Sequence, residues 1–190
     1  NGRASYWPRG KVLGGSSSIN AMVYVRGNKL DFDDWQAAGN PGWGYNDLLP
    51  YFKRMENWQH GADDYRGDKG PLNVADVTNK LHPLCKQFVA AANDYGIASN
   101  TDMNGAEQEG AGYYQLTTHM GQRMSAARAY LDSARQRPNL TIVCGALVQR
   151  IVFEQKRAVA VEYSHKQQIH RVNASKEIIL SAGAVNSPQL

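Results

Sequence analysis

Cysteine is scarce in this chain, and long apolar runs are absent from it. The 190 residues include two cysteines, Cys85 and Cys144, too far apart in sequence for a disulfide framework or a metal-binding motif. We therefore expect each to be a small buried apolar residue. No apolar run approaches the ~20 residues that a membrane-spanning helix requires. The net charge of +4 is small and the basic residues are scattered, which predicts no nucleic-acid partner.

The common short motifs of catalysis and metal binding are also missing. The sequence has no Walker phosphate loop, no Gly-x-Gly-x-x-Gly fingerprint and no serine in a Gly-x-Ser-x-Gly context. The adjacent aspartates Asp63 and Asp64 lack the ligand spacing of a calcium loop. We predict no metal site, and we assign no catalytic role to any of the histidines, which are His60, His82, His119, His165 and His170.

Composition and periodicity indicate a globular mixture of helices and strands. Hydrophobic residues make up 42% of the chain and charged residues 20%, as in ordered proteins. The pattern predicts helices over residues 29–38, 46–56, 83–95 and 126–135. It predicts strands over residues 72–74, 113–118, 140–144, 147–154, 158–163, 169–172 and 177–181. The expected fold class is α/β (α+β) with an attached β-meander.

Particular residues are expected to begin these helices or to face the core. Side chains of the Asn and Ser type cap helix N-termini, and apolar residues at helical spacing mark a buried face. The expected caps are Asn28, Asn46, His82 and Ser125, with Pro50 in the first turn of its helix. The expected buried positions on the first and third helices are Leu30, Phe32, Trp35, Leu84, Phe88 and Tyr95.

The stretch Pro8–Gly27 contains an unusual local pattern. Gly14 and Gly15 run directly into the serines at 16–18, and a run of small and apolar residues follows. Paired glycines let a ligand approach the main chain, and a serine-capped helix start can bind an anion such as phosphate. An ordinary Gly/Ser loop that opens a helix is an equally good interpretation of these residues alone.

The end of the chain carries a second pattern of this kind. The expected strand at 177–181 is uniformly apolar and runs into the small residues Ser181–Ala184, after which a helix begins. A buried strand of an α/β sheet shows this pattern, with ligands bound at its carboxyl end. Each of the two patterns supports a nucleotide-like ligand.

The two patterns together resemble the glucose–methanol–choline (GMC) family of flavin oxidoreductases. Residues 9–20, RGKVLGGSSSIN, look like its first signature, which continues through Tyr24 and Gly27. Residues 183–190, GAVNSPQL, look like the first half of its second signature. The resemblance covers the chain, is strongest to dehydrogenases of alcohols and choline, and implies the middle part of a Rossmann-like FAD-binding domain and part of a substrate-binding domain.

The resemblance also implies how the chain is divided and which residues meet FAD. Residues 1–28 would contact FAD, 29–138 would border the FAD and substrate domains, and 139–190 would supply strands of the FAD-binding domain. The implied cofactor contacts are Gly14, Gly15 and Ser16 at the diphosphate and flavin side, Asn20, Ala21, Met22 and Val23 at the isoalloxazine ring, Val148 at the adenine, and Ala182 and Gly183 at the adenosine half. Some members bind flavin covalently through a histidine where this chain has Ile19, so the expected FAD is non-covalent.

The activity implied is oxidation of an alcohol, either a primary aliphatic alcohol or choline, to the aldehyde. The α-carbon gives a hydride to flavin while a histidine takes the hydroxyl proton, and the electrons pass to a non-oxygen acceptor such as a quinone. We expect the chain to be an internal fragment, with the catalytic histidine beyond Leu190 and the dinucleotide fingerprint before Asn1. The expected location is the cytoplasm, with peripheral attachment to the inner membrane as an alternative.

Three other functions remain open at this point. An oxidase of the same family would pass its electrons to oxygen, and a hydroxynitrile lyase-like relative would keep FAD without redox turnover. A non-enzymatic anion-binding module would bind phosphate and no flavin. A quaternary ammonium substrate could use Tyr24, Trp35 or Trp43, although we expect core packing to be the role of each.

Overall fold

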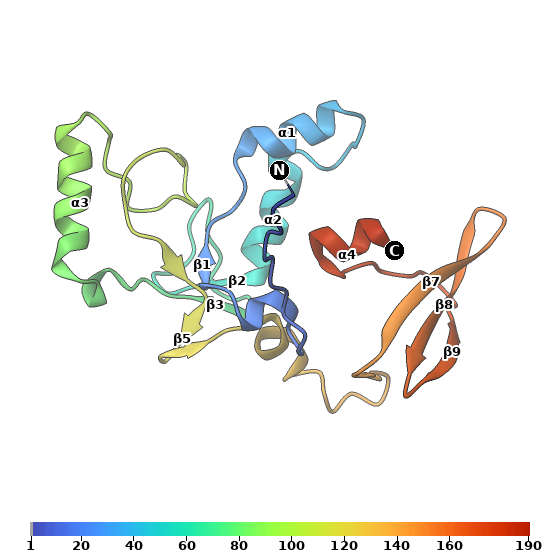
Figure 1. Ribbon diagram of the computed structural model, residues 1–190. Coiled ribbons are helices and arrows are strands. Elements are labelled where there is room, and N and C mark those ends of the chain that lie inside the picture. The colour runs from blue at the N-terminus through green and yellow to red at the C-terminus, as the bar shows by residue number, and fades with distance from the viewer. Residues whose placement is uncertain (1) are drawn as a thin grey trace. The chain divides into compact units, whose positions relative to one another are not determined.

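The computed structural model describes residues 2–190, so Asn1, the first residue of the expected 1–28 segment, lies outside the described residues (Figure 1). The chain divides into two compact units, unit 1 over Asn1–Arg137 and unit 2 over Pro138–Leu190. Helices and strands occur in both units, which confirms the mixed α/β (α+β) expectation. Each unit is described by itself.

Two of the helices of unit 1 form near the predicted positions. Helix α1 covers Lys29–Ala37, and Asn28 caps it by accepting from the Leu30 amide at 2.9 Å. Of the expected buried positions, Phe32 is buried, whereas Leu30 and Trp35 are exposed. Helix α2 covers Tyr45–Met55.

The predicted start of α2 was wrong by a short distance. Its cap is Gly44 and not Asn46, which lies inside the first turn. The helix begins early because an aspartate of α1 already satisfies its first amide: Tyr45 N donates to Asp33 Oδ1 at 2.9 Å. Pro50 consequently lies in the helix interior and not in the first turn, where it leaves the Asn46 carbonyl without its helical donor.

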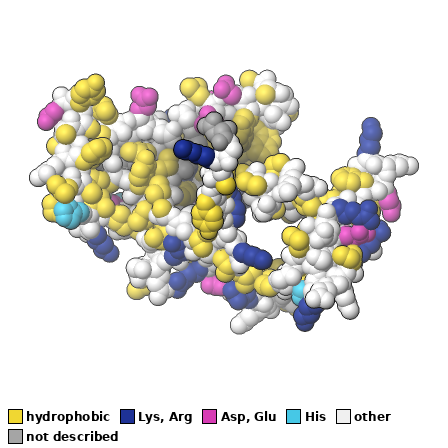
Figure 2. All heavy atoms as spheres, in the orientation of Figure 1, with side chains coloured by type: hydrophobic (Ala, Val, Ile, Leu, Met, Phe, Trp, Pro, Cys, Tyr) yellow, Lys and Arg dark blue, Asp and Glu magenta, His cyan; other side chains and the backbone are white. Residues whose placement is uncertain are grey.

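Helix α3, over Pro83–Asp94, also begins as predicted, with His82 Nδ1 accepting from the Leu84 amide at 3.3 Å. The expectation of a buried apolar face was wrong. Leu84 is 62% exposed, Phe88 77% and Tyr95 87%, and Figure 2 shows hydrophobic side chains gathered over this part of unit 1. Helical periodicity identifies an apolar face but does not supply the element that covers it, and no described element covers this one.

Short strands join distant parts of unit 1. Strand β1 (Val23–Tyr24) pairs antiparallel with β4 (Gln115–Leu116), and β2 (Glu56–Trp58) pairs parallel with β3 (Leu72–Val74). Strand β5 (Thr118–His119) forms a hairpin with β6 (Gln122–Arg123). A small core of Tyr24, Trp58 and Val74 lies between β1, β2 and β3. The predicted strand at 72–74 is confirmed, and the one at 113–118 is divided between β4 and β5.

A short 3₁₀-helix over Thr78–Lys80 precedes α3, and a π-helix over Ala127–Leu131 replaces the helix predicted for residues 126–135. Ser125 still acts at its start, because its hydroxyl accepts from the Arg128 amide at 3.3 Å.

Unit 2 contains the predicted meander. Strands β7 (Leu147–Glu154), β8 (Arg157–His165) and β9 (Gln168–Asn173) pair antiparallel in that order. The second hairpin turns through Lys166 and Gln167, both with positive φ, as a two-residue type I′ turn requires. Register shifts in β7 interrupt its simple alternation of faces. Helix α4, Gly183–Gln189, confirms the expected helix, which begins within the small residues, at Gly183.

Two predicted strands of unit 2 and one expected burial were wrong. Residues 140–144 and 177–181 form no strand, because a strand requires a hydrogen-bonded neighbour and the described residues supply none to either segment. Ile179 is 76% exposed and Leu180 46%. Cys144 is exposed and Cys85 half-buried, so neither is the fully buried residue that we expected.

Candidate functional site

The Gly/Ser segment of unit 1 forms a tight turn of 3₁₀-helix over Gly15–Ser18. Its cap is Gly14, with φ of 90°, and not one of the serines. The hydroxyls of Ser17 and Ser18 donate inside the segment, and Ser17 Oγ also accepts from the distant Ala126 amide at 2.8 Å. Ser17 Oγ donates to the Gly14 carbonyl at 2.5 Å, and Ser18 Oγ donates to the Leu13 carbonyl at 2.9 Å. The serines therefore shape the loop, and the prediction that they cap a helix was wrong.

Of the glycines in this segment, Gly15 leaves main chain accessible, whereas Gly14 lies close to Ser18 and Ala127. A Cβ on Gly10 would collide with the carbonyl of Gly15, so the two backbones touch. Gly15 itself has φ of 56°, and a Cβ there would meet nothing within 4 Å. Open main chain in the left-handed region lets a ligand reach backbone amides that a side chain would otherwise cover.

The next residues, 20–23, form a bend that is held from both sides. Asn20 Oδ1 accepts from the Met22 amide at 3.0 Å, and the Met22 carbonyl accepts from the Thr117 amide at 2.8 Å. Met22 has φ of 64°, which is uncommon for a residue other than glycine. Ala21 and Val23 are exposed. The structure thus places the seven predicted site residues of unit 1 in one short segment, in which each of them is exposed or half-buried.

The predicted site residues of unit 2 also lie near one another. Val148 and Ala182 line one cavity of about 470 Å³, together with Ala146, Leu147, Gln149, Asn186, Gln189 and Leu190. Gly183 begins α4 with φ of 89°, and a Cβ there would meet nothing within 4 Å. The cavity contains the residue that the sequence assigned to the adenine and one of the two that it assigned to the adenosine half.

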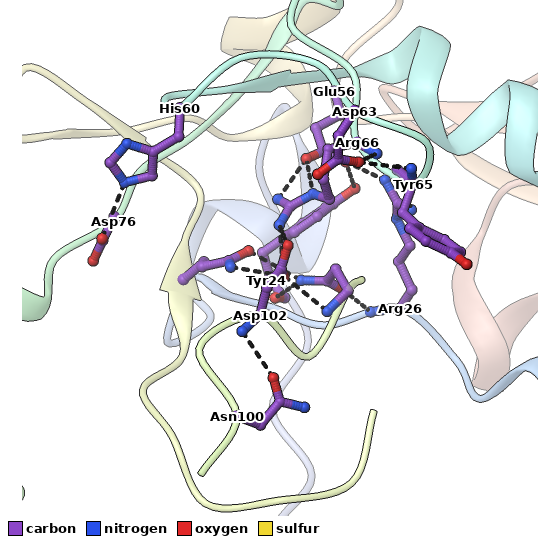
Figure 3. A network of polar contacts seen from close by, with 12 residues as sticks. Tyr24, Arg26, Glu56, His60, Asp63, Tyr65, Arg66, Asp76, Asn100 and Asp102 are labelled. Atoms are coloured by element: carbon purple, nitrogen blue, oxygen red, sulfur yellow. Dashed lines mark hydrogen bonds and ion pairs between the residues drawn. The ribbon is translucent and has the colours of Figure 1, made fainter. Parts of the chain in front are cut away.

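Unit 1 contains a buried polar network that the sequence did not reveal (Figure 3). Its centre is Glu56, which is fully buried. Glu56 pairs with Arg26 through one carboxylate oxygen and accepts from Arg66 Nε at 2.6 Å through the other. Arg66 also donates to both carboxylate oxygens of Asp102, at 2.7 and 2.8 Å. Tyr24 Oη donates to Glu56 at 3.2 Å.

Amide side chains extend the network toward the 104–115 loop. Asn104 Oδ1 accepts from the Arg26 amide at 2.8 Å, and Asn104 Nδ2 donates to Gln115 Oε1 at 3.1 Å. The sequence signal for these contacts is faint, because Arg26 is a single charge after an apolar stretch and Glu56 follows Lys53 and Arg54 like an ordinary charge at a helix end. The charges of two arginines and two carboxylates balance in this network. Its contacts join β1, β2 and the loops between them.

Burial and charge shift the pKa of Tyr24 and the pKa of Asp102 in the network. Burial, assisted by the Glu56 carboxylate, raises the pKa of Tyr24 to about 12. Burial alone would raise the pKa of Asp102, but the hydrogen bonds from Arg66, the Asn104 amide and Gln115 outweigh it and lower that pKa below its ordinary value. Tyr24 therefore stays protonated and Asp102 stays ionised at neutral pH.

Among the described residues, no histidine side chain makes a hydrogen bond to the Gly14–Val23 segment. His60 Nε2 lies 3.1 Å from Asp76 Oδ2 at the surface, His82 caps α3, and His170 stacks on Tyr163 in the meander. Within residues 2–190, no group of His, Cys, Asp or Glu side chains could hold a metal ion. Nor does that part of the chain contain a helix long and apolar enough to cross a membrane.

This chain is similar in sequence and in structure to known flavin-dependent enzymes and their relatives, as the two signature segments predict. Mitochondrial choline dehydrogenase of Homo sapiens is 52% identical over 100% of this chain and 32% of its own length. The crystal structure of pyridoxine 4-oxidase from Mesorbium loti superposes with a TM-score of 0.91 at 36% identity, over 98% of this chain and 37% of that one. An FAD-dependent oxidoreductase from Chaetomium thermophilum superposes with a TM-score of 0.87 at 34% identity, over 96% of this chain and 34% of that one.

The matches cover nearly all of this chain but only part of each relative. The chain spans about a third of the length of the relatives that it matches, so they speak for this part of the protein. The family described as GMC oxidoreductase matches residues 1–190. Since that match covers the whole chain, the chain belongs to the GMC oxidoreductase family.

Proposed function

We propose that the complete gene product is an FAD-dependent alcohol oxidoreductase with choline as its leading substrate, and that this chain supplies part of its FAD site. The observation that carries the proposal is the segment Gly14–Val23, where the open main chain of Gly15 is followed by an asparagine whose side chain accepts from the Met22 amide. The name of the human relative supports choline, and that of the Chaetomium protein supports FAD.

The residues present fit the cofactor chemically. Gly15 and the exposed Ser16 offer main chain with little side-chain cover, and Gly14 lies directly before them, as a diphosphate requires. Residues Asn20 to Val23 offer one polar side chain among apolar ones, as an isoalloxazine ring requires. In unit 2, the cavity beside Val148 and Ala182 and the open backbone of Gly183 fit an adenosine. Ile19, 52% exposed, has no nucleophilic atom, so FAD binds without a covalent bond.

Each part of the chain has a defined task in the proposed reaction. When bound, FAD supplies the acceptor for a hydride from the α-carbon of the alcohol. Residues 1–28 orient that cofactor and exclude water from one side of it, residues 29–138 border the FAD and substrate domains, and residues 139–190 hold its adenosine half. We assign no proton-transfer residue within this chain, because His60 and His82 are engaged elsewhere.

The electron acceptor divides the proposal into two variants. We favour a non-oxygen acceptor such as a quinone, in line with the name of the human dehydrogenase. The name of the Mesorbium oxidase supports oxygen as the alternative. A quinone would place the protein at the surface of the inner membrane, whereas a diffusing acceptor would leave it in the cytoplasm. Oxygen uptake during choline oxidation, measured with and without a quinone analogue, distinguishes the two.

The test of the activity itself is anaerobic titration of the purified complete gene product. We expect a flavin absorbance that bleaches on addition of choline and more slowly with a primary aliphatic alcohol. A bound flavin that no alcohol bleaches would point to a relative without redox turnover, such as a hydroxynitrile lyase. A colourless protein that takes up no added FAD but binds phosphate would refute the proposal in favour of an anion-binding module.

A further inference from the structure

Arg123 of β6 contacts the Asn20–Val23 bend more closely than any other described side chain does. Its Nη1 donates to the Asn20 carbonyl at 2.7 Å, to Asn20 Oδ1 at 2.8 Å and to the Ser17 carbonyl at 3.1 Å. One guanidinium nitrogen therefore lies among three oxygens of the Gly/Ser segment. Arg123 is itself half-buried, and no acidic side chain pairs with it among the described residues.

These contacts fix which way the amide of Asn20 points. Arginine has donors only, and the other partner of Asn20 Oδ1 is also a donor, the Met22 amide. Rotation of the amide by half a turn would place its NH₂ group against two donors, so the oxygen must face Arg123. The two N–H groups of Asn20 Nδ2 make no hydrogen bond within residues 2–190 and remain available to a ligand that carries acceptors.

The backbone beside Asn20 shows why such a clamp is needed. Met22 has φ of 64°, in the left-handed region that side chains disfavour. A residue persists there only when its surroundings hold it. The Met22 amide is held by Asn20, and its carbonyl accepts from Thr117 N at 2.8 Å and Thr117 Oγ1 at 3.2 Å. Loss of Arg123 would release one side of this arrangement.

We propose that Arg123 is a positioning residue that acts through Asn20, by aiming the amide N–H donors of Asn20 at the acceptor atoms of the flavin ring. The inference rests on the proposed function, because it takes residues 20–23 to border that ring. Amide donors stabilise the negative charge that a flavin gains on reduction. Arg123 thereby strengthens FAD binding and raises the reduction potential, although its guanidinium is directed at Asn20 and not at the cofactor.

The test uses four variants of the complete gene product: Arg123→Met, Arg123→Lys, Asn20→Ala and the Arg123→Met/Asn20→Ala double variant. Arg128→Met is the matched control, because Arg128 is an exposed arginine nearby whose side chain makes no hydrogen bond in the described structure. We measure the dissociation constant for FAD added to apoprotein, the midpoint potential of the bound flavin, and thermal unfolding.

Arg123→Met should weaken FAD binding about tenfold, equivalent to ~1.4 kcal/mol, and lower the midpoint potential. Arg123→Lys should restore part of both, since an ammonium reaches fewer of the three oxygens. Asn20→Ala should lower the potential as well. The midpoint potential of the double variant should be no lower than that of the single variant with the lower potential, because the effects of two residues that act in series do not add. Arg128→Met should match the unsubstituted protein.

Four results would overturn the inference. Additive shifts in the double variant would show that Arg123 acts by its own charge. An unchanged potential in Arg123→Met and Arg123→Lys, with only a lower unfolding temperature, would show a purely structural role. An unsubstituted protein that binds no FAD would refute the proposed function and this inference together, whereas normal FAD binding with insensitive variants would refute this inference alone.

Discussion

Substitution of Glu56 by Gln tests whether the buried network is held together by charge. The side chain of Glu56 is 0% exposed, and those of its partners Arg26 and Arg66 are 4% and 0% exposed. Glutamine keeps the shape of the side chain and removes its charge. Arg26 would then have no carboxylate partner, and Arg66 would keep only Asp102, whose side chain is 27% exposed.

The expected loss is large because an unpaired buried charge costs more than a lost contact. Removal of one partner of a buried ion pair typically destabilises a protein by ~3–5 kcal/mol. A whole domain is usually stable by only about 5–15 kcal/mol. Glu56→Gln should therefore shift the urea unfolding midpoint of unit 1 strongly. Tryptophan fluorescence reports the change, since the guanidinium of Arg66 lies 4.2 Å from the ring centre of Trp58.

The matched control is Asp132→Asn, which removes the acidic partner of a surface pair with Arg135. Both of these side chains are about half exposed, at 52% and 50%, and exposed pairs contribute about 0–1 kcal/mol. If Glu56→Gln costs no more than Asp132→Asn, the view that charge balance holds β1 and β2 together is incorrect.

Two further predictions concern pH and the meander. The lowered pKa of Asp102 adds stability that is fully present above the ordinary value of 3.8 and is lost as pH falls through the lowered value. Unfolding midpoints measured between about pH 3 and 7 should therefore fall less steeply on the acid side in Asp102→Asn than in the unsubstituted protein. Equal slopes in the two proteins would contradict this prediction. The turn residues Lys166 and Gln167 have φ of 50° and 64°, a conformation that Asn-Gly adopts more readily. Replacing them with Asn-Gly should therefore stabilise unit 2 by ~1 kcal/mol, measured by calorimetry. The control Lys156→Gly should show no such gain, because φ is not positive there.

The sequence was sufficient to predict the elements that local chemistry determines. The capping of α1 by Asn28 and of α3 by His82 follows from side chains that reach the nearest amides. The meander follows from alternating residues and short turns. Such features depend on neighbours in sequence, and the signature residues Gly14 and Asn20 were equally visible there.

Features that depend on distant partners were not predictable. The strand expected at 177–181 needs a neighbour, and the apolar face of α3 needs a cover; neither can be inferred from its own residues. The Glu56 network joins residues that come from separate loops, and its charges look like ordinary surface charges in the sequence. Arg123 was missed for the same reason, because its target, Asn20, lies 103 positions earlier.

These long separations also set the order in which the Gly/Ser segment can fold. The bend at Met22 is closed by Thr117, 95 positions later. Closing a loop of that length costs roughly 4 kcal/mol of chain entropy, which local contacts cannot repay. At a synthesis rate of about 5–20 residues per second, residues 14–23 wait on the order of 5–20 s for their partners to leave the ribosome. The Gly/Ser segment therefore takes its final form late in the biogenesis of this protein, after translation has passed β6.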